Sequence, residues 1–182
     1  MVAKAAVPSS RRVGGVAGAV TSGKAKRKTH VVKVRAGQGE IHSFLDVFRA
    51  EPLARVRIIK DGVSTSYVDR MARAMGMPKE RLLPALGLSP ATVNRRARES
   101  KKLSTEDSER VVGMARLVGQ VQAMVNESGD PNGFNAAEWV ARWLEAPLAA
   151  LGGQRPVELM DTTEGQAIVS NLLARVQSGA YA

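Results

Sequence analysis

Apolar residues recur at intervals of three and four along most of the chain after about residue 40, which is the spacing of one helical face. The pattern predicts an all-α protein. Helices are expected over 41–48, 52–60, 67–75, 78–86 and 90–98, then a long one from 104 to about 126, one after Asn135 and a last one over 162–177.

The apolar positions of the first three helices predict which face of each helix turns inward. Ser66 is expected to cap the third helix, which should end at Gly76. The residues expected to face inward are Phe44, Leu45 and Phe48 in the first helix, Leu53, Val56 and either Ile58 or Ile59 in the second, and Tyr67, Val68, Met71, Ala72 and Met75 in the third.

The helices over 78–86 and 90–98, with the turn between them, are typical of a helix-turn-helix. Gly87 ends the first, while Ser89 caps the second and Pro90 takes its first position. Pro84 lies inside the first helix, where a proline removes a hydrogen bond and costs about 3 kcal/mol. We therefore expect that helix to be kinked or to restart at Pro84.

The second of these helices is a candidate for DNA recognition. Val93 and Ala97 are four residues apart and should face the core. The remaining face is basic, and arginine can hold phosphates or read guanine, while asparagine can read adenine. A basic helix that is merely solvated is the alternative interpretation. The candidate DNA-binding residues are Thr92, Asn94, Arg95, Arg96 and Arg98.

The long helix is apolar on several sides. Ser104 and Asp107 form a capping pair at its start. Its seam consists of Val111, Met114, Val118, Val121 and Val125, and further apolar residues at Val112, Ala115, Leu117 and Met124 extend it round the helix. Such a helix must be buried nearly all round, as the spine of the domain or as a dimer interface. A homodimer is expected, also because a helix-turn-helix reader needs two-fold symmetry to meet two half-sites.

Two more capped helices follow. Asn135 and Glu138 can cap the first, Phe134 can pack on Trp139 as a hydrophobic staple, and both Trp139 and Trp143 are expected in the core. For the last helix, an acidic capping box of Asp161 and Glu164 places the start at Thr162, and Gly179 suits its end. Its expected apolar stripe is Ile168, Val169, Leu172, Leu173 and Val176.

Charge sets the N-terminal third apart. Residues 1–60 carry thirteen Lys or Arg and three acids, whereas the rest of the chain balances, so the formal net charge of +10 belongs to this third. Residues 1–38 hold no acid and little bulky apolar surface, which predicts a disordered basic arm suited to a polyanion. A signal or twin-arginine peptide at Ser10, Arg11 and Arg12, an organellar transit peptide, and a start codon assigned too early are the alternatives.

The composition argues against an enzyme. There is no cysteine, and the two histidines, His30 and His42, lie outside the well-patterned region. Disulfides, thiolate chemistry and cysteine metal sites are therefore excluded. We find no nucleophile beside a base and no phosphate loop, and the apolar run over 13–20 is too short to span a bilayer. We expect a cytoplasmic protein with no metal, no cofactor and no membrane contact.

An ordered series of residues at fixed spacing marks the C-terminal part of the chain. The series is Gly153, Pro156, Leu159, Met160, Thr162, Gly165, Val169, Leu173, Arg175, Val176, Gly179, Tyr181 and Ala182. It resembles the C-terminal toxin-binding domain of the Xre/MbcA/ParS antitoxins, with Met160 where the family usually has leucine. The resemblance extends over roughly 56–182 and makes the preceding helix-turn-helix Xre-like.

The resemblance implies an antitoxin of a type II toxin–antitoxin module, whose partner is a RES/ParT-like toxin that attacks NAD+. In the family the extreme C-terminus reaches into the toxin's cofactor pocket, and the N-terminal part in some members represses the operon. The implied toxin-binding residues are Arg175, Gly179, Ala180, Tyr181 and Ala182. A stand-alone helix-turn-helix transcriptional regulator, binding operator DNA, is the alternative function.

These features divide the chain into three expected parts. Residues 1–38 form the basic arm, 39–103 the Xre-like helix-turn-helix region, and 104–182 a helical dimerisation and toxin-binding domain.

Overall fold

The structure, a computed structural model, describes residues 43–128 and 132–177. All of them belong to one compact unit. The expected arm over 1–38 and the residues Gly179, Ala180, Tyr181 and Ala182 lie outside the described residues.

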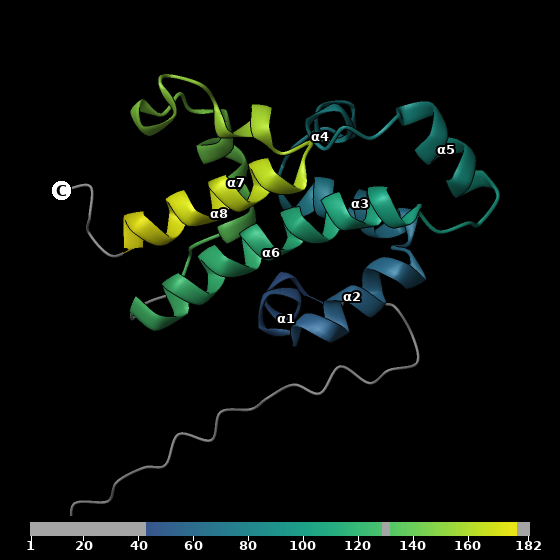
Figure 1. The fold of residues 1–182 in the computed structure, drawn as a ribbon, viewed down its shortest axis with the longest axis horizontal. Coiled ribbons are helices and arrows are strands. Elements are labelled where there is room, and N and C mark those ends of the chain that lie inside the picture. Colours follow the sequence, from purple (N-terminus) through teal and green to yellow (C-terminus); the bar gives the residue numbers. More distant parts are fainter. Residues whose placement is uncertain (1–42, 129–131, 178–182) are drawn as a thin grey trace, which may run out of the picture. The chain divides into compact units, whose positions relative to one another are not determined.

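Every regular element in the described part of the chain is helical, which confirms the all-α prediction (Figure 1). The α-helices are α1 (Phe44–Arg49), α2 (Pro52–Asp61), α3 (Thr65–Ala74), α4 (Lys79–Ala85), α5 (Pro90–Arg98), α6 (Thr105–Ser128), α7 (Ala136–Glu145) and α8 (Thr163–Gln177), and two 3-10 helices, η1 (Ala149–Leu151) and η2 (Pro156–Leu159), lie between α7 and α8.

Helix α6 is the spine of this unit. It packs against α1, α2, α7 and α8, and Figure 1 shows it running through the middle of the fold beside α8. Its first seam residues, Val111, Met114, Val118 and Val121, are buried within the chain, and Val125 is half-buried. The seam therefore forms part of the core of the chain and not a dimer interface. A homodimer would need a different surface.

The inward face of α2 differs from the predicted one. Leu53 and Val56 are 72% and 43% exposed, whereas Ile58 is buried and Ile59 half-buried. The face turned to α6 carries Arg55 together with Ile58 and Ile59, at spacings of three and four. Because one position of that stripe is a charged residue, the apolar pattern alone pointed to the wrong side of the helix.

Arg55 occupies this inward position with its guanidinium group hydrogen-bonded. Its Nη1 group donates to the backbone carbonyls of Phe48 and Ala50, where α1 ends and the chain turns into α2. In α1, Val47 is the buried residue, while the expected Phe44, Leu45 and Phe48 are half-buried.

The helix-turn-helix region largely follows its sequence signals. All five residues expected to face inward from α3 are buried, although Ser64, not Ser66, caps the helix by accepting from the Ser66 amide. Ser89 caps α5 as predicted. Helix α4 continues through Pro84 and ends at Ala85, so it does not restart there, and the alternative of a kink stays a prediction. The helix has only seven residues, and the proline falls in its last turn, where few hydrogen bonds depend on it.

Helix α7 keeps its predicted cap but not its predicted aromatic core. The Asn135 side chain accepts from the amides of Ala137 and Glu138, and the Phe134 and Trp139 rings lie 6.3 Å apart, as expected for a staple. Trp139 and Trp143 are half-buried and stacked on each other at 6.0 Å. The residues that α7 buries are Ala136, Ala137, Val140, Ala141 and Leu144.

Helix α1 approaches α6 at Gly119. A β-carbon at this position would overlap the carbonyl oxygen of Phe44 and press on the Phe48 side chain. Because backbone atoms are involved, the two helices cannot accommodate a larger residue by a change of rotamer. Gly119 therefore serves the packing of α1, at the cost of a lower helix propensity within α6.

We predict that Gly119→Ala lowers the free energy of unfolding by about 1–3 kcal/mol, because α1 must move away from α6. Thermal and urea unfolding of the full chain measure the change. The comparison variant is Ala174→Gly at an exposed position of α8, which reports propensity alone and should cost about 1 kcal/mol. A Gly119→Ala protein that melts higher than the parent would show that the close approach does not constrain the fold.

Candidate binding surfaces

The start of α8 is set by Thr162. Its Oγ1 accepts a hydrogen bond from the Gly165 amide at 3.0 Å, and the helix begins at Thr163, one residue later than predicted. Asp161, the expected cap, lies beside the turn after α4 instead, where a β-carbon on Gly87 would be 3.2 Å from the Asp161 β-carbon. Both residue types cap helices well, so the sequence alone did not decide between neighbouring positions.

Gly165 allows α8 to pack closely on η2. A β-carbon there would overlap the carbonyl oxygen of Leu159. Gly165 belongs to the ordered C-terminal series. This contact explains why that position requires glycine. The first turn of α8 is consequently held against the preceding 3-10 helix.

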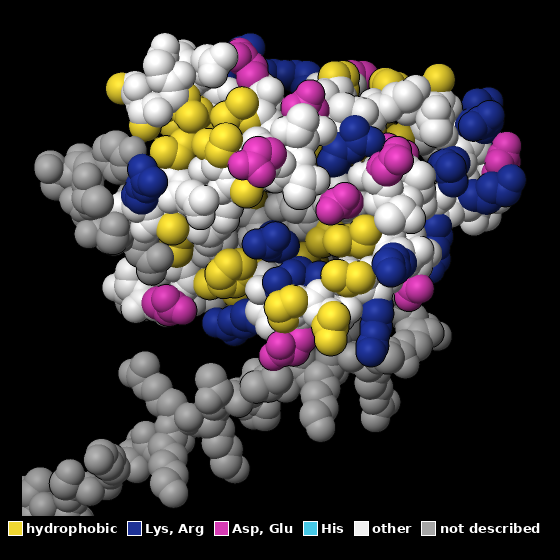
Figure 2. Space-filling view, in the orientation of Figure 1, with side chains coloured by type: hydrophobic (Ala, Val, Ile, Leu, Met, Phe, Trp, Pro, Cys, Tyr) yellow, Lys and Arg dark blue, Asp and Glu magenta, His cyan; other side chains and the backbone are white. Residues whose placement is uncertain are grey.

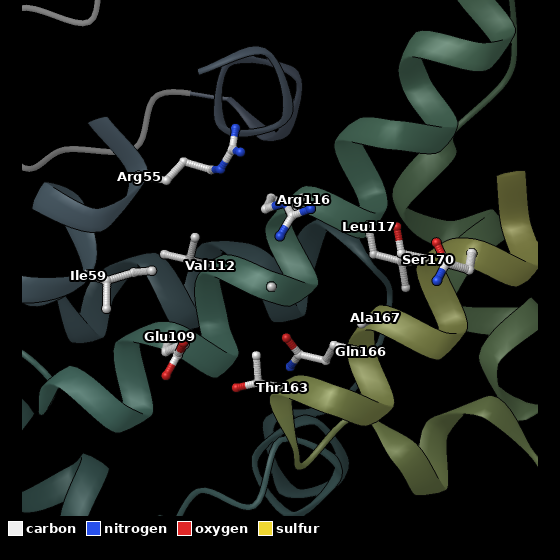
Figure 3. Close-up of a pocket in the computed structure, with 12 residues that line it drawn as sticks. Arg55, Ile59, Glu109, Val112, Arg116, Leu117, Thr163, Gln166, Ala167 and Ser170 are labelled. Carbon is white, nitrogen blue, oxygen red and sulfur yellow. The ribbon is translucent and has the colours of Figure 1, made fainter. Parts of the chain in front are cut away.

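Gln166 joins three elements and was missed by sequence reasoning. It is 8% exposed, and its Nε2 donates to the carbonyl of Met160 at 2.8 Å and to that of Arg110 at 3.1 Å. Figure 3 shows its side chain reaching from α8 toward α6. Room for it comes from Gly113, where a β-carbon would overlap its Oε1. The sequence signal that could have indicated this contact is Gly113, a glycine in the middle of a long helix.

One turn further along, Ser170 and Gln120 form a second link between α8 and α6. The Ser170 hydroxyl pairs with Oε1 of Gln120 at 2.7 Å, and Nε2 of Gln120 donates to the Ser170 carbonyl at 3.0 Å. With Gln166, this pair fixes both the rotation and the axial position of α8 on the spine. The outward face of α8 is therefore presented in one orientation.

That outward face holds one residue predicted to be inside. Val169, Leu172 and Leu173 are buried as expected, but Ile168 is 40% exposed. The inward stripe passes through Gln166 instead of Ile168, because the amide side chain has polar partners on α6 and η2. The side chain of Val176 is not among those described.

Of the implied toxin-binding residues, the structure places Arg175. It lies on the exposed side of α8, one turn or less from the end of the helix. The other four, Gly179, Ala180, Tyr181 and Ala182, follow the last described residue, Gln177. An exposed helical face with an apolar residue and a cation thus leads directly into the tail.

The five candidate DNA-binding residues on α5 do not share one environment. Asn94, Arg95 and Arg98 are exposed, whereas Thr92 and Arg96 are half-buried. Val93 is buried as predicted, but Ala97 is exposed, so its predicted inward position is wrong.

Arg96 takes the place expected for Ala97. Its Nη1 donates to the Lys102 carbonyl at 2.8 Å, so its side chain folds back and holds the loop that follows α5. A long side chain can cover the helix end in this way while its charged group meets a carbonyl. Arg96 therefore holds part of the fold together, and fewer of the five candidate side chains are free to contact a partner than predicted.

The surface of α5 and its following loop is nonetheless strongly basic. Figure 2 shows dark blue side chains gathered at the edge of the molecule where α5 lies. Glu99 is an acid among them, and its pKa is lowered, first by a hydrogen bond and the charge of Lys101 and then by the charges of Arg95 and Arg96. The cations Lys101, Arg95 and Arg96 surround this single acid, and such a basic surface favours an anionic partner.

Comparison with known proteins identifies the family. A family model for the antitoxin Xre-like helix-turn-helix domain matches residues 54–116, and one for the antitoxin Xre/MbcA/ParS C-terminal toxin-binding domain matches residues 129–179. A relative from Sphingobium sp. (strain YBL2), named Prs ADP-ribosylating antitoxin, is 51% identical over 136 residues, which are 75% of this chain and 86% of the relative. The chain belongs to the Xre/MbcA/ParS antitoxins.

More distant relatives agree with this assignment. Two proteins named Antitoxin Xre, from Yersinia enterocolitica and Photorhabdus laumondii subsp. laumondii, are 28% and 24% identical to this antitoxin. The matches cover 68% and 67% of this chain and 78% and 77% of the two relatives. The first family model ends within α6, so the spine contributes to the helix-turn-helix match as well as to the support of α8.

Two further observations concern the described residues only. Across 43–128 and 132–177, no helix combines the length and the apolar character needed to cross a membrane. In the same part of the antitoxin, no group of three or more His, Cys, Asp or Glu side chains is arranged to hold a metal ion.

We predict that Gln166→Leu destabilises the antitoxin by about 1–3 kcal/mol, because the carbonyls of Met160 and Arg110 lose their buried donor. Chemical denaturation of the full chain measures this loss. Gln154→Leu is the matched control, because Gln154 is exposed and only its backbone groups make hydrogen bonds among the described residues. Equal stability of the two variants would mean that Gln166 does not tie α8 to the spine.

Proposed function

We propose that this antitoxin neutralises an NAD+-consuming toxin of the RES/ParT kind by docking α8 on the toxin and inserting its C-terminal tail into the NAD+ pocket. The observation that carries the proposal is the fixed presentation of α8. Gln166 and the pair of Ser170 with Gln120 hold its inner side, which leaves an outward face with Ile168 and Arg175 leading into the tail.

The chemistry of the partner is inferred from the relative. That protein, 51% identical, is named a Prs ADP-ribosylating antitoxin, and ADP-ribosylation takes its ADP-ribose from NAD+. A toxin of this kind needs an NAD+ pocket, and a protein segment that occupies the pocket inhibits it without any catalytic group. The antitoxin accordingly acts by occupancy and not as an enzyme. The toxin is expected to be encoded beside the antitoxin, and co-purification with the product of the adjacent gene is the first test.

Within the tail, Tyr181 is the residue assigned to fill the pocket. It is the only large side chain among Gly179, Ala180, Tyr181 and Ala182, and its hydroxyl is their only polar side-chain group. A tyrosine offers apolar area for a cofactor site together with one hydrogen-bonding group. The docked helix and the plug therefore have separate tasks, binding and inhibition.

We predict that removal of Ala180, Tyr181 and Ala182 leaves the melting temperature of the antitoxin nearly unchanged, because the described core of α8 ends at Leu173. The truncated chain should still form a complex with the toxin, yet NAD+ loss in the mixture should continue. Two measurements are needed: the melting temperature of the antitoxin alone, and NAD+ consumption by the complex.

A full-length Tyr181→Phe variant serves as the control, since it keeps the ring and should retain most inhibition. A folded, truncated antitoxin that inhibits completely would exclude the plug and assign inhibition to the face of α8. Absence of binding by the intact chain would overturn the proposed function itself.

A second activity, repression of its own operon, is proposed for α5. It is favoured by the three exposed side chains Asn94, Arg95 and Arg98 on a basic surface. A homodimer belongs to this proposal because two half-sites require two recognition helices. Since the seam of α6 is used inside the chain, the dimer contact is assigned to another surface.

We predict that Arg95→Ala weakens binding to the antitoxin's own promoter by about 1–3 kcal/mol, and binding to random DNA by less. The exposed Arg142 on α7 provides the control variant Arg142→Ala, which should change neither. Fluorescence anisotropy at a fixed salt concentration, with promoter and random duplexes of equal length, measures both affinities. Equal losses of affinity for the two duplexes would show that Arg95 contacts phosphates and does not read the promoter sequence.

A further inference from the structure

A cleft with a volume of about 220 Å³ lies where α2, α6 and α8 meet (Figure 3). Apolar side chains such as Ile59, Val112 and Leu117 contribute to its walls. Its polar lining includes Arg55 from α2, Arg116 from α6, and Gln166, Ser170 and Asn171 from α8. None of the lining residues comes from the recognition helix α5.

Arg55 brings a fixed positive charge to this cleft. Its Nη1 is held by the carbonyls of Phe48 and Ala50, so the guanidinium has little rotational freedom. Its pKa is lowered, first by burial and then by the positive charge of Arg116, while the charge of Glu51 acts in the opposite direction. Arg55 and Arg116 line the same cleft, so their positive charges repel each other.

Arg116 has no compensating acid in the described part of the chain. It is exposed, and neither a hydrogen bond nor an ion pair joins it to another described residue. Figure 3 shows the two guanidinium groups toward the same side of the cleft, while the carboxylate of Glu109, the only acid in the lining, points away from them. Two arginines with unused donors therefore face one space.

A carboxylate fits this arrangement best. Guanidinium groups bind carboxylates through paired N–H groups, and an anion between two arginines relieves their repulsion. The volume lies below the roughly 300–1,000 Å³ that is usual for small-molecule sites, so a nucleotide is too large. One acidic side chain fits within this space with its methylene groups against the apolar wall.

We propose that this cleft receives an aspartate or glutamate side chain of the toxin and anchors it beside α8. The inference rests on the proposed function, because α8 belongs to the matched toxin-binding domain and forms one wall of the cleft. A DNA phosphate is disfavoured by the apolar wall and by the absence of α5 from the lining. The anchor would extend the toxin contact from α8 onto α6 and α2.

The test is calorimetric titration of the full-length antitoxin with the purified toxin. Arg116→Glu should weaken the Kd at least ten-fold, and the neutral variant Arg116→Gln should weaken it by a smaller factor. Arg57→Glu is the matched control: Arg57 is exposed on α2 and does not line the cleft, so its change should stay within two-fold. Because Arg116 is exposed, its variants should keep the parental melting temperature.

The interacting acid is identified by charge reversal in the toxin. Replacement of that Asp or Glu with Arg should restore binding to Arg116→Glu while weakening binding to the parent. The proposal is overturned if the parent binds toxin and both Arg116 variants bind as well as Arg57→Glu does. It is also overturned if Arg116→Glu leaves toxin binding intact but weakens DNA binding more than Arg57→Glu. A parent chain that binds no toxin would instead overturn the proposed function.

Discussion

The burial of α6 is the constraint on which the rest of the structure depends. A helix with apolar residues on nearly every side cannot remain in water, and four other helices cover it. Coverage from several directions requires close approach, and glycines supply it at two points, Gly119 under α1 and Gly113 under Gln166. Both glycines weaken the helix itself, so the packing they allow must offset that loss.

The elements were predictable because capping residues and glycine turns mark their ends locally. The caps at Ser89, Ser104 and Asn135 were correctly assigned, as was the burial of the long helix. The orientation of some helices was not predictable, because it depends on partners distant in sequence. Arg55 turns inward only because the carbonyls at the end of α1 lie within its reach, and an apolar pattern contains no information about them.

The same reasoning explains what was missed in the candidate site. Ile168 was assigned to the core because it is apolar, yet Gln166 takes the inward position once Gly113 leaves room for its amide. Arg96 displaces Ala97 for a related reason, since the Lys102 carbonyl satisfies its guanidinium. In each case a polar side chain with a specific acceptor occupies a position that hydrophobicity assigns elsewhere, and the apolar residue left outside becomes available for a partner.

The two regions matched by family models share one core. Buried residues of α3 and α4, such as Val68 and Leu83, belong to the same cluster as Val140 and Leu173 from the C-terminal region. Helix α4 also packs on η2, and Arg81 pairs with Glu145 at 2.6 Å between α4 and α7. Because α4 in turn packs against α5, helices α5 and α8 are positioned by one continuous set of contacts. The orientation of α8 and that of α5 are consequences of the same packing, and a substitution that loosens the spine acts on both surfaces together.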